Sequence, residues 1–144
     1  FDDKIRSCVL GCTTSILNSL LPDLQKNTNI YETLNIFYKN LDNDNFIIYY
    51  LNWEIELIQQ LGFGVNIEKK ISLKENYNDL YSFKIDEFVY EIPYFLVSKE
   101  INSNFSNQLI KKGLTFTRNL FFNKIFNVNN IQLPKQRIIL EKYF

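Results

Sequence analysis

The sequence predicts a mainly α, compact helical domain of about five helices with one small β-hairpin insertion. Apolar residues recur at helical spacing through most of the chain, whereas alternation of period two is confined to a short stretch around residues 81–92. The chain has 144 residues, of which 46% are hydrophobic and 16% aromatic. That is enough for one core, so we expect residues 1–144 to form a single domain.

The most apolar stretch, residues 46–64, is predicted to contain the central helix. It holds the only tryptophan, Trp53, and two adjacent apolar stripes at helical spacing, which together give a wide buried face. Gly62 is expected just past the last turn, where a left-handed conformation costs glycine little. Asn43 or Asp44 is the expected N-cap, because a short side-chain oxygen can accept from the first free amides.

Two helices are expected before the central one. Residues 5–21 carry an apolar stripe, and Pro22 is expected to end that helix because proline has no amide hydrogen. Asn29 followed by Glu32 resembles a capping box and predicts a second helix that starts there. The linker of residues 42–45 is short enough to fold this helix back against the central one.

The hairpin is expected in an insertion of about residues 66–95. Residues 81–85 and 88–92 alternate between apolar and polar on either side of Asp86-Glu87. That pair lacks the glycine favoured in a two-residue turn, which leaves a longer loop open.

Two more helices follow the hairpin. The first spans residues 106–126, and Gly113 within it leaves open a break into two segments. Pro134 is expected at the first position of a short last helix. Its buried side is predicted to comprise Ile138, Ile139 and Tyr143.

The charges are distributed unevenly along a chain whose net charge is zero. Residues 1–68 carry a balance of −5, residues 69–104 a balance of −1, and residues 105–144 a balance of +6. A basic C-terminal third suits nucleic acid or an acidic peptide. The alternative is that these cations pair with the acidic part of the same chain, and both interpretations remain open.

The residue types exclude the common catalytic sites, so we do not expect an enzyme. The chain has no histidine, and therefore no conventional Ser-His or Cys-His arrangement. Glu54 and Glu56 are two apart and diverge by about 200° on a helix, which prevents joint acid–base work. Cys8 and Cys12 cannot complete a zinc site alone and are expected to be buried free thiols. No segment is typical of a membrane span or signal peptide, which predicts a soluble cytoplasmic protein.

Three stretches in order resemble the C-terminal helical domain of the bacterial recombination mediator RecO, in its alphaproteobacterial form. They are LNWEIELIQQLGFGVNI at 51–67, IPYFLV at 92–97, and GLTFTRNLFFNKIF at 113–126 followed by LPKQRIILEKY at 133–143. The resemblance implies a RecO C-terminal fold, and it implies that the family's N-terminal OB-fold would precede Phe1. Many members carry a four-cysteine zinc cluster after the central block. Residues 66–80 contain no cysteine, so no zinc or other cofactor is implied.

RecO proteins act in DNA repair and homologous recombination through the RecF pathway. The resemblance therefore implies a non-catalytic domain that docks single-strand-binding protein and supports DNA binding, strand annealing and RecA loading. The implied partners are single-strand-binding protein, RecR, and single- and double-stranded DNA, in the cytoplasm at the nucleoid. The alternative is a helical scaffold or interaction domain with no DNA role of its own.

In the family, the helical domain receives the acidic, phenylalanine-ended tail of single-strand-binding protein in an apolar pocket with basic neighbours. Arg118 matches a basic position of the corresponding family helix, whereas Leu51-Asn52 stands where many relatives carry arginines. Trp53 and Leu57 could instead be core residues, as their apolar character favours. The candidates for the tail site are Trp53, Leu57, Phe116, Arg118 and Phe122. The candidates for phosphate contacts are Lys111, Lys112, Lys124, Lys135 and Arg137.

Overall fold

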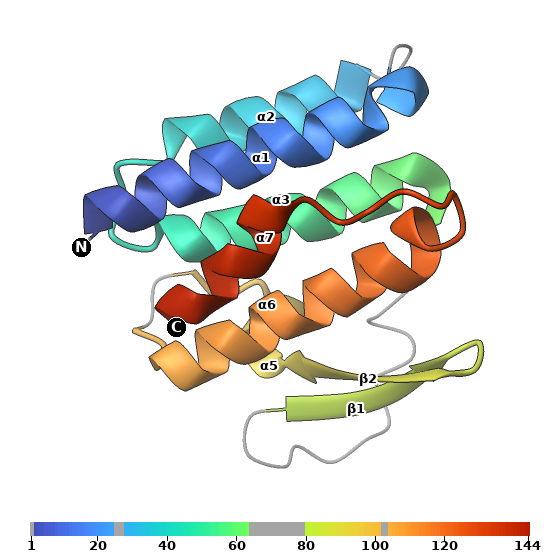
Figure 1. The fold of residues 1–144 in the computed structure, drawn as a ribbon. Helices are drawn as coiled ribbons and strands as arrows, with labels where there is room; N and C mark the ends of the chain where they lie inside the picture. The colour runs from blue at the N-terminus through green and yellow to red at the C-terminus, as the bar shows by residue number, and fades with distance from the viewer. Residues whose placement is uncertain (1, 25–27, 64–79, 102–103) are drawn as a thin grey trace.

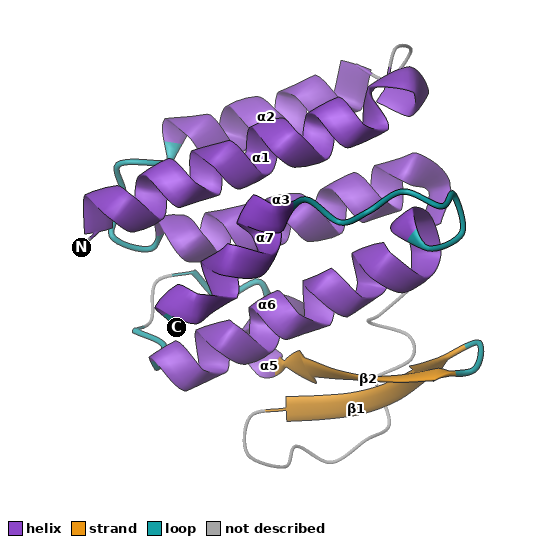
Figure 2. Ribbon diagram, viewed as in Figure 1, coloured by secondary structure: helices purple, strands orange, loops and turns teal. Residues whose placement is uncertain are grey.

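The computed structural model describes residues 2–24, 28–63, 80–101 and 104–144. Within them lie six α-helices and a two-stranded antiparallel sheet, which confirms the mainly α fold with a hairpin (Figure 1, Figure 2). The elements in chain order are α1 (Asp2–Leu24), α2 (Thr28–Lys39), α3 (Phe46–Ile58), η1 (Gln59–Phe63), β1 (Leu80–Ile85), β2 (Phe88–Pro93), α5 (Tyr94–Ser98), α6 (Asn107–Phe121), η2 (Phe122–Phe126), α7 (Lys135–Leu140) and η3 (Glu141–Tyr143). Here η1 and η2 are π-helical turns and η3 is a 3₁₀ turn.

Helix α3 lies in the middle of the molecule, as Figure 1 shows. Helix α2 packs against α3 on one side, and α6 packs against it on the other. The hairpin covers α6 through β2, while α7 crosses back to pack against α1. None of the helices in the described part of the chain is long and apolar enough to span a membrane.

The ends of α3 agree in part with the predicted caps. Gly62 has a φ of 89°, the left-handed conformation expected of it. The N-cap is Asn45 rather than Asn43 or Asp44. The Asn43 side chain instead accepts a hydrogen bond from the Asn45 amide at 3.0 Å, and Asn45 donates its side-chain amide to Ile101 O at 2.7 Å. The cap residue therefore fixes the start of α3 to the segment before α6.

The break predicted at Pro22 and the one left open at Gly113 do not occur. Helix α1 continues for two residues past Pro22, to Leu24. Helix α6 is continuous through Gly113. A Cβ built on Gly113 would lie 3.0 Å from Leu51 Cδ1 and 3.4 Å from Leu96 Cδ1. Glycine at this position allows α6 to approach α3 closely.

The hairpin has the predicted strands with a tight turn. Ile85 pairs with Phe88, so Asp86-Glu87 forms a two-residue loop and the longer loop is not needed. Asp86 supplies the required left-handed backbone with a φ of 52°, which aspartate tolerates better than most residues. Residues 66–79 of the predicted insertion lie outside the described part of the chain.

Helix α7 is rotated relative to the prediction. Ile138 and Ile139 are 46% and 44% exposed, while Arg137 and Leu140 are fully buried. The predicted buried side was therefore wrong, although Tyr143 is partly buried. The apolar pattern misled because a charged residue, Arg137, turns inward to meet an internal carboxylate.

Candidate functional site

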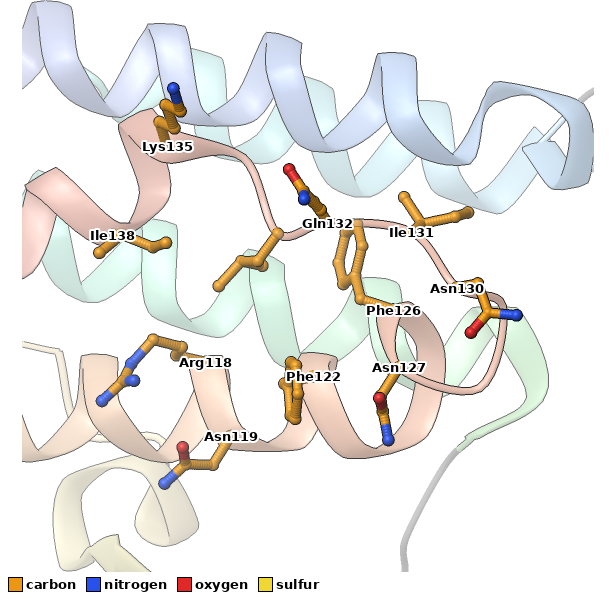
Figure 3. A pocket seen from close by; sticks show the side chains of 11 residues that line it. Arg118, Asn119, Phe122, Phe126, Asn127, Asn130, Ile131, Gln132, Lys135 and Ile138 are labelled. Carbon is orange, nitrogen blue, oxygen red and sulfur yellow. The ribbon is translucent and has the colours of Figure 1, made fainter.

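A pocket of about 760 Å³ lies between the end of α6 and the chain that leads into α7. Figure 3 shows its lining side chains, which come from α6, η2, the connecting segment and α7. The lining combines apolar groups, four side-chain amides and two cations, and it includes no carboxylate. Its members are Arg118, Asn119, Phe122, Phe126, Asn127, Asn130, Ile131, Gln132, Leu133, Lys135 and Ile138.

The apolar part of the pocket is open to solvent. Phe122 is 47% exposed and Ile138 is 46% exposed, whereas Phe126 is fully buried behind them. The adjacent Phe121 is also fully buried, so the last residue of α6 faces the core and the first residue of η2 faces the pocket. Exposed aromatic and aliphatic groups gathered in a hollow are typical of a binding site.

The two cations lie toward one end of the pocket. Figure 3 shows Arg118, Ile138 and Lys135 at that end, with Asn127 and Asn130 toward the other. The side chain of Arg118 is 36% exposed, and its Nε donates a hydrogen bond to Glu141 Oε1 at 2.6 Å. Lys135 is exposed. The pocket therefore offers an apolar surface beside positive charge, an arrangement suited to a ligand with a carboxylate and an apolar group.

A buried polar cluster joins the helices behind this pocket. Arg137 Nε donates to Glu54 Oε2 at 2.8 Å, and both side chains are 0% exposed. Arg137 Nη2 donates to Leu114 O at 2.8 Å and to Thr117 Oγ1 at 2.9 Å. Thr117 in turn donates to Glu54 Oε1 at 3.0 Å. These contacts tie α7 to α3 and α6, so they fix the wall of the pocket that α7 provides.

Burial and ion pairing shift the pKa values of Glu54 and Arg137 in opposite directions. Burial raises the pKa of the Glu54 carboxyl, and the charge and hydrogen bond of Arg137 offset part of that rise. Burial by itself would lower the pKa of Arg137, but the Glu54 carboxylate outweighs it and the pKa stands above its ordinary value. Glu54 is not among the residues that line the pocket. Its role is therefore internal pairing, and it gives no support to an acid–base site.

The predicted tail-site residues do not come together. Trp53, Leu57 and Phe116 are 2%, 0% and 2% exposed, so they are core residues. Arg118 and Phe122 alone among the five candidates line the pocket. Trp53 instead borders a separate groove of about 230 Å³ between α2 and α3.

The predicted phosphate contacts are also dispersed. Lys112 pairs with Glu91 at 3.7 Å, and Lys124 pairs with Asp86, so both cations contact carboxylates of the hairpin. Lys111 and Lys135 are exposed and pair with no carboxylate among the described residues. The structure corrects the assignment of Arg137, because a fully enclosed guanidinium cannot reach a phosphate.

Sequence reasoning missed several residues of the site. Ile138 was assigned to the core, and Ile131 and Leu133 received no role because they lie in an irregular segment without periodicity. Glu141, the one acidic residue among residues 105–144, received no role. A useful signal was present in Glu54, a carboxylate whose neighbours one turn away along α3 are all apolar: Tyr50, Leu51, Leu57 and Ile58.

Metal binding has no candidate within the described residues, which contain no cluster of three or more His, Cys, Asp or Glu placed to hold an ion. Residues 66–79, the region in which the resemblance would place a zinc cluster, are outside the described part. The prediction of no zinc therefore stays a prediction.

Comparison with known proteins finds similarity over nearly the whole chain. The chain is 26% identical to DNA repair protein RecO of Wolbachia pipientis wMel over 160 aligned residues, which cover 97% of the chain and 66% of that protein. It is 25% identical to DNA repair protein RecO of Wolbachia pipientis subsp. Culex pipiens over 95% of the chain and 64% of that protein. It is 32% identical to DNA repair protein RecO of Ehrlichia chaffeensis over 46% of the chain and 28% of that protein. No family model and no solved structure matches.

The chain spans about two thirds of the length of the Wolbachia relatives it matches, 66% and 64%. Their shared name agrees with the resemblance found in three separate stretches of the sequence. The chain is therefore RecO-like over nearly its whole length.

Proposed function

We propose that this chain is part of a RecO-like DNA repair and recombination protein, and that its pocket docks the acidic C-terminal tail of single-strand-binding protein. The relatives named DNA repair protein RecO support the general role. One observation carries the docking role. The exposed Phe122 and Ile138 share a pocket with Arg118 and Lys135, and no acidic residue lines it.

The pocket fits both features of such a tail, its apolar terminal ring and its negative charge. A terminal phenylalanine ring would rest against Phe122 and Ile138, and its burial is worth roughly 1.5–3 kcal/mol. The terminal carboxylate would accept from Arg118, whose guanidinium forms charge-assisted hydrogen bonds. The remaining acidic residues of the tail would lie near Lys135. The proposed site therefore recognises an apolar end and a negative charge together.

For DNA, we propose a minor contribution from this part of the protein. Of the five candidate cations, Lys111 and Lys135 remain available to phosphates, since Lys112 and Lys124 are paired with the hairpin and Arg137 is buried. This pairing favours a second candidate function, a helical scaffold with no DNA role of its own. Contact with RecR, strand annealing and RecA loading enter the proposal from the resemblance to RecO. We propose no catalytic activity.

Titration of the protein with a fluorescent peptide that contains several aspartates and ends in phenylalanine tests the docking role. Arg118→Glu should weaken binding at least tenfold, because it replaces the carboxylate's partner with a like charge. Lys111→Glu is the matched control, since it makes the same charge change on α6 outside the pocket and should have a small effect. Equal affinity for wild type and Arg118→Glu would contradict the proposal.

Salt dependence separates the DNA role from the scaffold role. Phosphate contacts release counterions, so the affinity for a single-stranded oligonucleotide should fall steeply between low and moderate salt. Lys111→Gln with Lys135→Gln should reduce that slope. Absence of binding at low salt, or a flat response, would favour the scaffold.

A further inference from the structure

We infer that Glu141 is an internal competitor for Arg118 that sets the affinity of the pocket for acidic ligands. This inference deepens the proposed function and rests on it. Glu141 does not line the pocket; it lies behind the rim, at the start of η3. Its role would be to position Arg118 and to cancel part of its charge.

The contacts of Glu141 support a positioning role. Its Oε1 accepts from Arg118 Nε at 2.6 Å and from Arg137 Nη1 at 3.4 Å. Arg137 is itself bonded to Glu54, so one end of the arrangement is anchored in the core. Glu141 is 13% exposed, whereas the Arg118 side chain is 36% exposed. A mostly buried acid thus contacts a more exposed arginine at the pocket rim.

The same contacts leave Arg118 able to take a ligand. A guanidinium has five N–H donors in a planar fork, and Glu141 engages the Nε group. Among the described residues, Arg118 makes no second side-chain hydrogen bond, so its two terminal nitrogens remain available. An incoming carboxylate can therefore bind Arg118 while Glu141 stays in place, so the two acids compete for the charge of one guanidinium.

The charges explain why Glu141 should reduce affinity. The cluster contains two carboxylates and two guanidiniums, from Glu54, Glu141, Arg118 and Arg137. Its net charge is zero, so an anionic ligand gains little long-range attraction from Arg118. Neutralising Glu141 leaves the cluster at +1 within a few ångströms of the rim. At a solvent-exposed rim, where the effective dielectric approaches that of water, this change is expected to tighten an anionic ligand by roughly three- to tenfold.

Glu141→Gln is the decisive variant, because the amide oxygen can still accept from Arg118 while the charge is lost. We expect it to bind the acidic, phenylalanine-ended peptide roughly three- to tenfold more tightly than wild type. Asp42→Asn, an exposed change in the turn between α2 and α3, removes one negative charge outside the pocket lining and should leave the affinity unchanged. Affinity of Glu141→Gln equal to or below that of wild type would overturn the inference.

A double-mutant cycle of Glu141→Gln and Arg118→Gln distinguishes competition at Arg118 from a general change of the fold. In an Arg118→Gln background, the gain from Glu141→Gln should shrink to less than twofold. Glu141→Asp retains the charge and should bind within about twofold of wild type. A full gain in the Arg118→Gln background would overturn the inference.

The two proposals fail in different ways. If wild type binds the peptide but Glu141→Gln binds no more tightly, Glu141 is not a competitor and the docking function stands. If neither protein binds the peptide, the docking function fails and the inference fails with it. Thermal unfolding of each variant shows that the protein is folded at the temperature of the titration.

Discussion

Arg137 Nε lies 2.8 Å from Glu54 Oε2, although 83 residues separate them in the sequence and neither side chain is exposed. The pair connects the last helix to the central one. A buried ion pair contributes little net stability compared with apolar residues of similar size. Removal of one partner alone, however, leaves a buried charge unpaired. The pair therefore acts mainly to specify where α7 sits, and with it one wall of the pocket.

Removal of one partner should be strongly destabilising. Arg137→Met should lower the free energy of unfolding by about 3–5 kcal/mol, because Glu54 would be left buried and unpaired. Glu54→Met should have a similar cost. The double replacement should recover much of the loss, and urea denaturation of the four proteins measures the coupling. A loss below about 1 kcal/mol for Arg137→Met would show that the pair does not fix α7.

Two helical glycines should respond in opposite directions to the same change. Gly113→Ala should destabilise by about 1 kcal/mol or more, because the added methyl would crowd Leu51 and Leu96 and overpacking outweighs the gain in helix propensity. In α1, a Cβ on Gly11 would lie 3.8 Å from Gln136 Cγ, an ordinary contact. Gly11→Ala should therefore stabilise by up to about 1 kcal/mol. Equal effects in urea denaturation would contradict the close approach of α6 to α3.

Neighbouring phenylalanines should separate folding from binding. Phe121 is fully buried, so Phe121→Ala should cost about 3–5 kcal/mol of stability. Phe122 is 47% exposed, so Phe122→Ala should cost less than about 1 kcal/mol while peptide affinity falls. Thermal unfolding and peptide titration of both variants provide the comparison. If Phe122→Ala leaves peptide affinity intact, Phe122 is not part of the binding surface.

The protein should lose stability in alkali through two buried groups. Burial raises the pKa of the Cys12 thiol, and burial followed by the nearby Glu54 charge raises the pKa of Tyr50. Each group loses its proton at lower pH in the unfolded chain than in the folded one. The stability that each group contributes is therefore fully present below its pKa in the unfolded chain, which is about 8.5 for cysteine and about 10 for tyrosine. That stability is lost as the pH rises toward the pKa of the group in the folded protein.

Urea denaturation between neutral pH and strongly alkaline pH measures this loss. Above its unfolded pKa, each group should remove about 1.4 kcal/mol of stability per pH unit. Cys12→Ala should flatten the decline in stability that begins near the unfolded pKa of cysteine. Tyr50→Phe should flatten the decline that begins near the unfolded pKa of tyrosine. An unchanged slope in both variants would show that neither group stays protonated in the folded protein.

The fold was largely predictable because local patterns and packing agree. The alternation around residues 81–92 predicted both strands, and the double stripe of residues 46–58 predicted the central helix. Tertiary packing overrode local preference where the predictions failed. Gly113 lowers the helix propensity of α6 but allows α6 to approach α3 closely. Arg137 is charged, yet its side chain lies on the buried side of α7.

The site was predictable only in part. Arg118 and Phe122 were chosen through the resemblance to RecO, and both line the pocket. Trp53 and Leu57 were better explained as core residues, because nothing in an apolar stripe reveals which edge stays exposed. The opposite wall of the pocket comes from an irregular segment, residues 127–134. No periodicity marks such a segment, so its contribution becomes visible only in three dimensions.

Photo-crosslinking tests the central claim most directly. The probe is an acidic peptide whose C-terminal phenylalanine is replaced by benzoylphenylalanine, and mass spectrometry identifies the attached residue. We expect attachment within residues 118–138, at Phe122, Ile138 or their pocket neighbours. We also expect attachment to be lost in Arg118→Glu. Attachment to the groove beside Trp53 between α2 and α3, unaffected by Arg118→Glu, would contradict the claim.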